Sequence, residues 1–199
     1  MYIHREIEKK IKPFLQRKEI VAIIGPRQAG KTTLLKYVAS ALQSIHQGVK
    51  FITFEKRSDL TLFQDNLEDF KDSVKSYQVV IIDEFQYARE GGQKLKYLYD
   101  TTNVKFIISG SSSLELTFQT GKYLVGRMLN FILWPFSFRE YLSHADPELY
   151  NLIQERIPNA LSGDFKVSNF FGQEINSRLE KLFENYLVYG GYPAVVLAN

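Results

Sequence analysis

The chain has 199 residues, of which 45% are hydrophobic and 24% are charged, and it contains no cysteine. This composition is ordinary for a soluble globular protein with one full domain and a smaller appendage. The lack of cysteine excludes disulfides, thiolate metal sites and cysteine nucleophiles, and it fits a reducing compartment, so we expect a cytoplasmic protein. The net charge of +3 is spread along the chain, which gives no support for nucleic-acid binding.

The amino-terminal stretch, MYIHREIEKKIKPF, predicts an amphipathic helix that stops near Pro13. It alternates charge with isoleucine and lacks the apolar centre of a signal peptide. The longest apolar runs, such as residues 20–24 and 79–82, are far shorter than the roughly 20 residues of a membrane span. We therefore expect no membrane contact. The apolar positions of the helix are Ile3, Ile7, Ile11, Phe14 and Leu15.

Four short runs of β-type residues follow, and each leads into a loop or a helical pattern. They read IVAIIG, VKFITFE, QVVIIDE and VKFIISGSSS, and a fifth run, LNFILWPF, comes after a glycine-containing loop. Continuous apolar strands that alternate with helices are typical of a parallel sheet that is buried on both faces. The sequence therefore predicts an α/β fold with about five parallel strands.

From residue 135 onward the pattern becomes helical, which predicts a boundary between a core, residues 1–135, and a helical region, residues 136–199. Ser137 and Glu140 have the spacing of a capping box. The polar segment 146–172 carries only weak strand and turn signals. The chain ends on apolar residues, GGYPAVVLAN, so we expect that more chain follows.

A later helix in this region has one apolar face and stops at the pair Gly190 and Gly191. A glycine pair ends a helix because it adopts left-handed backbone angles without a steric cost. The apolar face is formed by Ile175, Leu179, Leu182, Phe183, Tyr186 and Leu187.

A glycine-bracketed loop separates the first predicted strand from a helix. Residues 25–32, GPRQAGKT, match the phosphate-loop pattern G-x-x-x-x-G-K-[ST] at each fixed position. Such a loop curls so that several backbone N–H groups point at one anion, and the helix that follows adds a partial positive charge. A chance strand-to-helix turn is the alternative, which the flanking strand and helix disfavour. The predicted nucleotide contacts are Gly25, Pro26, Arg27, Gln28, Ala29, Gly30, Lys31, Thr32 and Thr33.

Two side chains of this loop have distinct predicted roles. Lys31 supplies a full positive charge for the β- and γ-phosphates of ATP, and the hydroxyl of Thr32 is a hard ligand for Mg²⁺. The run VVIIDE supplies the acidic partner. Asp83, at the tip of a buried strand, is expected to hold Mg²⁺ through water. Glu84 is expected on the other side of the strand end, where it polarises the attacking water. Two carboxylates that solvate a strand end are the alternative.

Further polar residues are weaker candidates. The strand VKFIISGSSS ends in serines, and Ser111 or Ser109 could sense the γ-phosphate by hydrogen bond; we take Ser111 as the catalytic candidate and leave Ser109 open. A serine-rich turn is the alternative. Gln86 in DEFQ is a further polar candidate, for which a capping or surface role is equally good.

Arg127, and as a second choice Arg139, could neutralise charge in the transition state, although most arginines form surface pairs. Whether such an arginine acts within its own chain or on a neighbour stays open. The three histidines, His4, His46 and His144, have no metal-ligand spacing.

The motifs together resemble a known family. GPRQAGKTTLL, IIDEFQ, ISGSSS, LVGRM, PFSFREYL and YLVYGGYPAVV occur in this order in archaeal-type predicted ATPases of the AAA superfamily. The resemblance covers the chain from about Ile20 onward. It implies a three-layer α/β/α ATPase core, with strand order 5-1-4-3-2 of the additional-strand class, and a small lid-like helical region. It also implies a carboxy-terminal domain of uncertain role that would begin where this sequence ends.

The expected function is Mg²⁺-dependent ATP hydrolysis that drives or switches an attached domain or a protein partner. A nucleotide-gated switch with little turnover is the main alternative. A small-molecule kinase is less favoured, because a glutamate directly after the strand aspartate suits water activation. A GTPase is disfavoured because no [NT]-K-x-D motif occurs. Assembly into an oligomer stays open.

Overall fold

A computed structural model describes residues 2–44, 48–111, 121–160 and 172–198, so His46 lies outside it. The chain forms two compact units. The larger unit comprises Ile7–Trp134, and the smaller unit comprises Met1–Glu6 together with Pro135–Asn199. The assignment of residues 1–135 to a nucleotide-binding core and of 136–199 to a lid-like region stays a prediction. In the described residues, no helix combines the length and apolar character that a membrane crossing requires.

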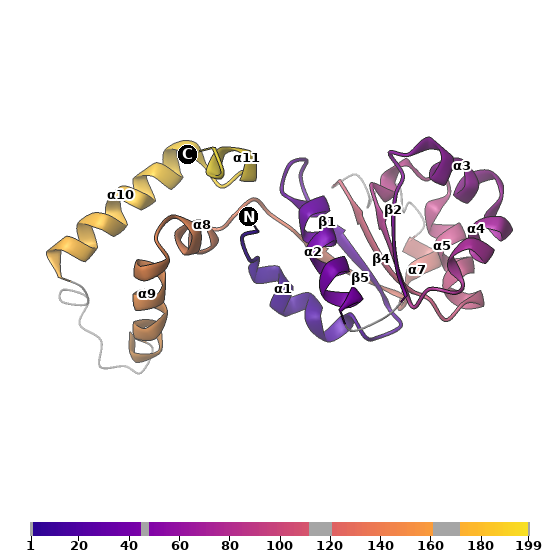
Figure 1. The fold of residues 1–199 in the computed structure, drawn as a ribbon, viewed down its shortest axis with the longest axis horizontal. Helices are drawn as coiled ribbons and strands as arrows, with labels where there is room; N and C mark the ends of the chain where they lie inside the picture. Colours follow the sequence, from indigo (N-terminus) through magenta and orange to yellow (C-terminus); the bar gives the residue numbers. More distant parts are fainter. Residues whose placement is uncertain (1, 45–47, 112–120, 161–171, 199) are drawn as a thin grey trace. The chain divides into compact units, whose positions relative to one another are not determined.

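The larger unit is built around a five-stranded sheet with the order β2-β3-β4-β1-β5 (Figure 1). Each neighbouring pair of strands is parallel. This is the predicted order 5-1-4-3-2, which is therefore confirmed. The strands are β1 (Ile20–Ile24), β2 (Val49–Thr53), β3 (Val79–Asp83), β4 (Lys105–Gly110) and β5 (Met128–Ile132).

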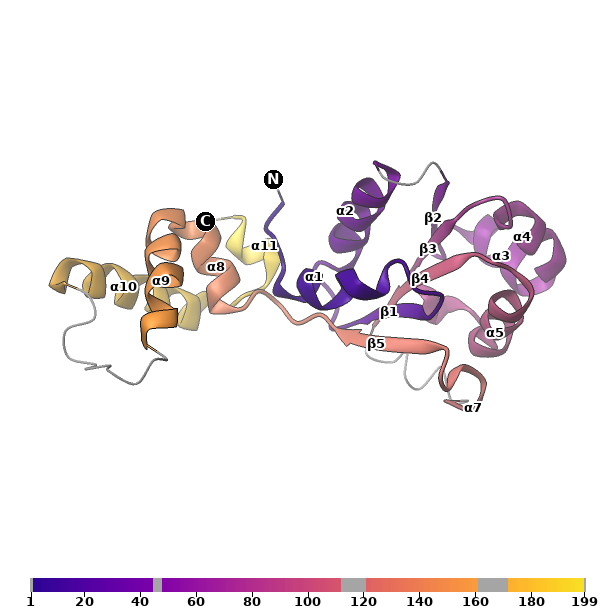
Figure 2. The same cartoon turned by 90° about the horizontal axis from the view of Figure 1, so that it is seen from below.

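The three central strands are buried along their whole length, whereas the edge strands β2 and β5 are only partly covered. A parallel strand that is buried on both faces needs helices on both sides, which explains the nearly unbroken apolar runs IVAII and VVIID. Figure 2 shows α2 on one side of the sheet and α5 on the other. The predicted three-layer α/β/α arrangement is thus confirmed.

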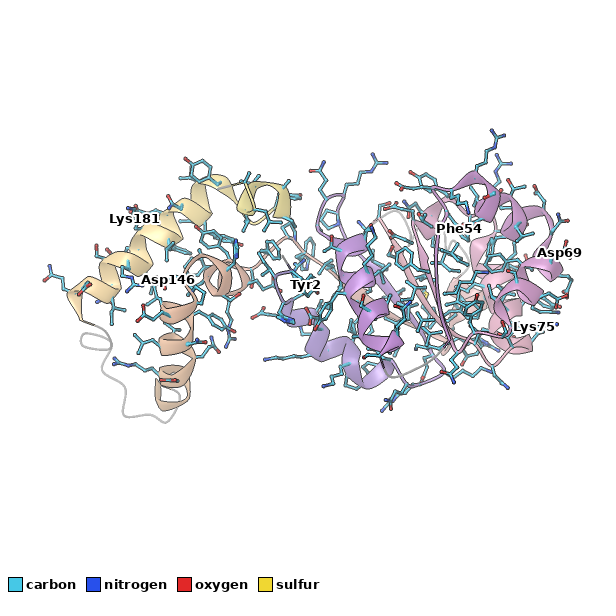
Figure 3. All side chains as sticks on the ribbon, viewed as in Figure 1. Tyr2, Phe54, Asp69, Lys75, Asp146 and Lys181 are labelled. Carbon is cyan, nitrogen blue, oxygen red and sulfur yellow. The ribbon has the colours of Figure 1, made fainter. Side chains whose placement is uncertain are left out.

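Phenylalanine side chains fill much of the core between the sheet and α3 and α4. The Phe63 ring lies 5.0 Å from the ring of Phe54, which is labelled in Figure 3, and 5.1 Å from that of Phe70. All three side chains are almost fully buried. The helices of the larger unit are α1 (Glu6–Ile11), η1 (Lys12–Phe14), α2 (Lys31–Gln43), α3 (Arg57–Asp65), α4 (Leu67–Val74), η2 (Phe85–Tyr87), α5 (Gly91–Thr101) and α7 (Gly121–Leu124).

The amino-terminal helix is shorter than its apolar spacing predicts. It begins at Glu6, so Ile3 precedes it, and it ends at Ile11. The chain then continues through Pro13 in η1, because a proline is tolerated in the first turn of a helix. Phe14 ends η1 and packs against Phe131 of β5, with 5.6 Å between the ring centroids.

The smaller unit contains α8 and α10 where the sequence predicts helices. The capping box is confirmed: the Ser137 hydroxyl accepts a hydrogen bond from the Glu140 N–H at 3.2 Å, and the Glu140 carboxylate accepts one from the Ser137 N–H at 2.9 Å. Helix α10 ends before Gly190, whose φ is 77°. The helices of this unit are α8 (Phe138–Ala145), α9 (Pro147–Ala160), α10 (Gln173–Tyr189) and α11 (Pro193–Val196).

The prediction of weak strand and turn structure from residue 146 is wrong for 147–160, which form α9. The Asp146 side chain, labelled in Figure 3, accepts a hydrogen bond from the Leu149 N–H at 3.0 Å, and Pro147 has the φ angle of a first helical residue. Asp146 followed by proline is therefore a helix start, which the polar pattern of this segment did not predict. Residues 161–171 of the same segment lie outside the described residues.

The first residues of the chain belong to the smaller unit. The Arg5 guanidinium pairs with the Glu140 carboxylate at 3.2 Å, and both side chains are nearly buried. The Glu6 N–H donates to the same carboxylate at 2.6 Å. The guanidinium of Arg5 also lies over the Phe136 ring, 4.5 Å from its centroid. Glu140 thus joins the chain start to α8.

A buried lysine lies at the amino end of β4. The Lys105 side chain is 7% exposed, and its ammonium donates a hydrogen bond to the backbone carbonyl of Glu19. Burial disfavours the charged form, so it lowers the pKa of Lys105 from 10.5 to about 8, although the Glu19 carboxylate acts in the opposite direction.

We expect Lys105 to make the stability depend on pH. Between about pH 8 and 10.5 the unfolded chain keeps a proton that the native Lys105 has lost. The contribution of Lys105 to the free energy of unfolding therefore increases as the pH rises through this window. The variant Lys105→Met lacks this gain. Urea unfolding of both proteins from pH 7.5 to 10.5 measures it. Lys36→Met, at an exposed lysine, is the control. A constant difference between the parent and Lys105→Met would contradict the expectation.

Candidate nucleotide-binding site

The phosphate-pattern loop connects the carboxyl end of β1 to the amino end of α2. Gly30 precedes α2 with φ 92°, a left-handed angle that glycine adopts without a steric cost. Gln28 also has a positive φ, 63°, which is unfavourable for a residue with a Cβ atom. Such backbone strain concentrates at ligand sites, because the surrounding structure must hold it in place. These backbone angles therefore indicate that the loop does more than connect β1 to α2.

Gly25, the first glycine of the pattern, is not needed for the curl of the loop that the sequence suggests. Gly25 does not have a positive φ. A Cβ atom at this position would lie 2.1 Å from the carbonyl oxygen of Leu133, directly after β5. The Leu133 N–H donates to the Ile24 carbonyl at 2.7 Å, which keeps the two chains this close. Gly25 is thus required by the close approach of two backbones rather than by the curl of the loop.

Lys31 is buried inside its own loop. Its side chain is 6% exposed, and its ammonium donates to the carbonyls of Gly25 at 3.0 Å and Pro26 at 2.9 Å. Burial lowers the pKa of Lys31, and the carboxylates of Glu84 and Asp83 oppose this shift. A buried ammonium that is held by neutral carbonyls is well suited to an anionic ligand, because the ligand would supply the charge that the carbonyls lack.

Thr32 connects the loop to the end of β3. Its hydroxyl donates to the Asp83 carboxylate at 2.6 Å, and Asp83 is 2% exposed. The other carboxylate oxygen accepts from the Ser109 hydroxyl and from the Glu84 N–H at 3.1 Å. Three donors thus hold the two oxygens of the Asp83 carboxylate. The structure therefore brings Thr32 and Asp83, the two residues predicted for Mg²⁺, into direct contact.

Of the two serine candidates, the structure places Ser109 beside Asp83. Ser109 is fully buried in β4, and its hydroxyl oxygen also lies 3.4 Å from the Glu84 N–H. The signal was present in the sequence: aligning the runs VVIID and KFIIS from their first residues, as the register does, puts Asp83 opposite Ser109. Ser111 follows β4 and is half-buried. Its role as a sensor stays a prediction.

Glu84 leaves the strand in an unexpected conformation. Because β3 ends at Asp83, the alternation of strand side chains does not decide where Glu84 points. Its backbone is left-handed, with φ 56° and ψ 42°, and its carboxylate accepts a hydrogen bond from the Gln86 amide. It raises the pKa of Lys31 by more than Asp83 does, so its charge acts on the loop. Its role as the water-activating base stays a prediction.

Arg127 lies at the end of the strands opposite the loop. It directly precedes β5, whose first residue pairs with the first residue of β1, whereas the loop follows the last residue of β1. A strand of five residues is about 16 Å long. Arg127 donates to the Asp100 carboxylate at 3.0 Å. Arg127 is thus about one strand length from the loop of its own chain, and its role in neutralising transition-state charge, in its own chain or on a neighbour, stays a prediction.

The remaining candidates are less informative. Arg139 belongs to the smaller unit, where its guanidinium contacts the Gln154 side chain and lies 3.8 Å from the Glu6 carboxylate. In the loop, Arg27 and Gln28 are exposed and Ala29 is buried. The predicted nucleotide contacts of Pro26, Arg27, Gln28, Ala29 and Thr33 stay predictions.

The site does not contain a complete metal-binding cluster of protein side chains. Within the described ranges, no group of three or more histidine and acidic residues could hold a metal ion. This pattern fits the chemistry of Mg²⁺, which is usually bound by one or two side chains, several waters and the phosphates of a substrate. Thr32 and Asp83 would be those side chains.

The strand order, the loop after β1 and the acid at the end of β3 define a P-loop NTPase fold. Within this class the chain belongs to the AAA domain family (AAA_14), whose model matches residues 17–142. The family implies nucleotide binding, and it confirms the resemblance on which the strand order was predicted.

An archaeal relative and two solved structures are similar to this chain. The uncharacterized protein MJ1637 of Methanocaldococcus jannaschii is 30% identical over an alignment of 199 positions, which covers 94% of this chain and 41% of that protein. The chain thus spans less than half the length of this relative. The Hsp104:casein complex of S. cerevisiae has a TM-score of 0.57 at 17% identity and covers 98% of this chain and 36% of its own. AMPPCP-bound DnaA from Aquifex aeolicus has a TM-score of 0.52 at 12% identity, and the match covers 97% of this chain and 57% of the DnaA chain. These structures show the fold alone.

Proposed function

We propose that this chain binds ATP together with Mg²⁺ and hydrolyses it, and that hydrolysis drives or switches an attached domain or a protein partner. The observation that carries the proposal is the 2.6 Å hydrogen bond between Thr32 and Asp83, which fixes the loop to the acidic strand end. A loop used only as a connection would not need a buried lysine and a buried aspartate, because buried charged groups destabilise the fold.

Binding rests on the loop and on the first turn of α2. Lys31 would exchange its two carbonyl partners for the β- and γ-phosphate oxygens, which supply the negative charge that its buried ammonium lacks. The free N–H groups at the start of α2 would donate to the same phosphates. Bound Mg²⁺ would neutralise charge on the phosphate oxygens, with the Thr32 hydroxyl and the Asp83 carboxylate as its protein groups.

Hydrolysis rests on Glu84, whose carboxylate is half-buried beside the loop. A carboxylate at this place can accept a proton from the water that attacks the γ-phosphorus. Because the chemistry of phosphoryl transfer is mostly positioning and charge neutralisation, the loop and one oriented base are the parts that this chain would supply.

A nucleotide-gated switch with little turnover is the second candidate. It is favoured by the position of Arg127, which is paired with Asp100 at the end of the strands opposite the loop. An arginine supplied by a neighbour or partner would then be needed for fast hydrolysis. The greater length of the relative supports such a partner domain on the same polypeptide. A cytoplasmic location, expected from the lack of cysteine, stays a prediction.

We expect Lys31→Ala to weaken ATP binding by about 100-fold, since a charge-assisted contact to phosphate contributes about 3 kcal/mol. Fluorescence anisotropy with a labelled ATP analogue and Mg²⁺ measures the affinity. Lys36→Ala is the matched control, because Lys36 is exposed on the same helix. Equal affinities of Lys31→Ala and the parent, both with a normal unfolding transition, would contradict the assigned role of the loop.

We expect Glu84→Gln to keep the ATP affinity within about threefold and to slow hydrolysis by about 100-fold or more, because an amide cannot accept the proton of the attacking water. Single-turnover phosphate release measures the chemical step, and the anisotropy assay measures binding. Glu180→Gln, at an exposed glutamate of α10, is the control. If Glu84→Gln released phosphate at the parent rate, Glu84 would not be the base.

A further inference from the structure

Gln86 lies two residues after the proposed base and contacts it directly. It is the central residue of η2, and its amide nitrogen donates a hydrogen bond to Oε2 of Glu84. Its amide oxygen is buried and has no hydrogen-bond partner among the described residues. The side chain thus makes one polar contact to the Glu84 carboxylate and leaves its second polar atom unsatisfied.

The backbone around Gln86 is firmly held. Phe85 is 1% exposed, and its ring lies 5.6 Å from Phe54 and 5.7 Å from Phe63. On the other side of Gln86, the Tyr87 carbonyl accepts a hydrogen bond from the Gln64 amide at 3.0 Å. The neighbours of Gln86 are therefore fixed to the core and to α3. The backbone thus holds Gln86 firmly in place for its contact with Glu84.

The unsatisfied amide oxygen argues against a purely structural role. A buried acceptor without a partner destabilises the folded state, and native proteins almost always satisfy such groups. A leucine of similar size would remove this penalty. The cost of this glutamine to stability indicates a use other than stability, and Glu84 is the group that its amide contacts.

We propose that Gln86 is a positioning residue that holds the Glu84 carboxylate in the orientation needed to activate the attacking water. This inference rests on the proposed function. With Oε2 of Glu84 held by the amide, Oε1 is the oxygen that accepts the proton. The water oxygen forms a bond to the γ-phosphorus, the bond from that phosphorus to the β,γ-bridging oxygen breaks, and ADP leaves with the electron pair. One proton of the water goes to Glu84, and the other stays on the released phosphate.

The test compares Gln86→Leu with the parent chain in steady-state ATP hydrolysis and in thermal unfolding. We expect kcat to fall about tenfold or more, as it does when the orienting partner of a reactive group is removed. KM should stay within about threefold, because the polar contact of Gln86 is with Glu84 and not with the phosphate loop. The unfolding midpoint should stay equal or rise, since the buried acceptor is gone. Gln93→Leu, at an exposed glutamine of α5, is the matched control.

A second variant, Gln86→Glu, distinguishes positioning from general damage. It keeps the size of the side chain but places a second carboxylate beside Glu84, and two neighbouring carboxylates share a proton at higher pH than one alone. The acidic limb of the kcat profile should therefore move to higher pH. Lys31 and Asp83, the other charged groups beside Glu84, are unchanged in both variants.

The outcomes separate this inference from the proposed function. If the parent chain hydrolyses ATP and Gln86→Leu keeps the parent kcat, the positioning role is wrong while the ATPase proposal stands. A loss of kcat that is accompanied by a lower unfolding midpoint and by an unshifted pH profile in Gln86→Glu would also overturn it, because damage to the fold would then explain the loss. If the parent itself releases no phosphate from ATP, both proposals fail together.

Discussion

The hydrogen bond between Thr32 and Asp83 is the constraint on which the rest of the site depends. Because β4 lies between β1 and β3, the loop and the acid start from strands that are two positions apart in the sheet. Two strand spacings are about 9.6 Å. The first turn of α2 must therefore lean across the end of β4, and the Thr32 hydroxyl completes this bridge. Ser109 of β4, the strand between them, is buried and donates to the same carboxylate.

The insertion of β4 thus explains why three separate sequence runs meet at one point. Asp83 receives hydrogen bonds from the loop, from β4 and from the residue that follows it. An aspartate that accepts hydrogen bonds on both oxygens is held in one orientation. The consequence is a rigid acidic edge that faces a buried lysine. Groups that the fold holds in fixed positions are the requirement for catalysis by positioning.

Much of this arrangement could be predicted from the sequence, and the failures have physical reasons. The pattern GPRQAGKT and the run VVIIDE identify loop and acid because their chemistry needs fixed residue types at fixed spacing. The strand order came from a family resemblance and not from periodicity, which cannot order strands. The position of Arg127 required the register of β5, and the need for Gly25 comes from Leu133, more than a hundred residues away. Neither is visible in a local pattern.

The backbone conformation of Glu84 was also not predicted from the sequence. Strand alternation was used to place Glu84, but its left-handed φ of 56° is unusual for a glutamate and cannot be read from neighbouring residues. The same conformation brings Gln86 back onto the Glu84 carboxylate. The strained residues Gln28 and Glu84 flank the site from the loop and from the strand end. Strain of this kind persists only where the surrounding packing imposes it.

Isothermal titration calorimetry of the parent chain with ATP tests the central claim most directly. If residues 25–32 form a cradle for a triphosphate, ATP with Mg²⁺ should give saturable one-site heat with a dissociation constant between about 1 μM and 1 mM, and chelation of the metal with EDTA should weaken binding. The absence of any binding heat from ATP at millimolar concentration, with Mg²⁺ present and the chain folded, would contradict the account.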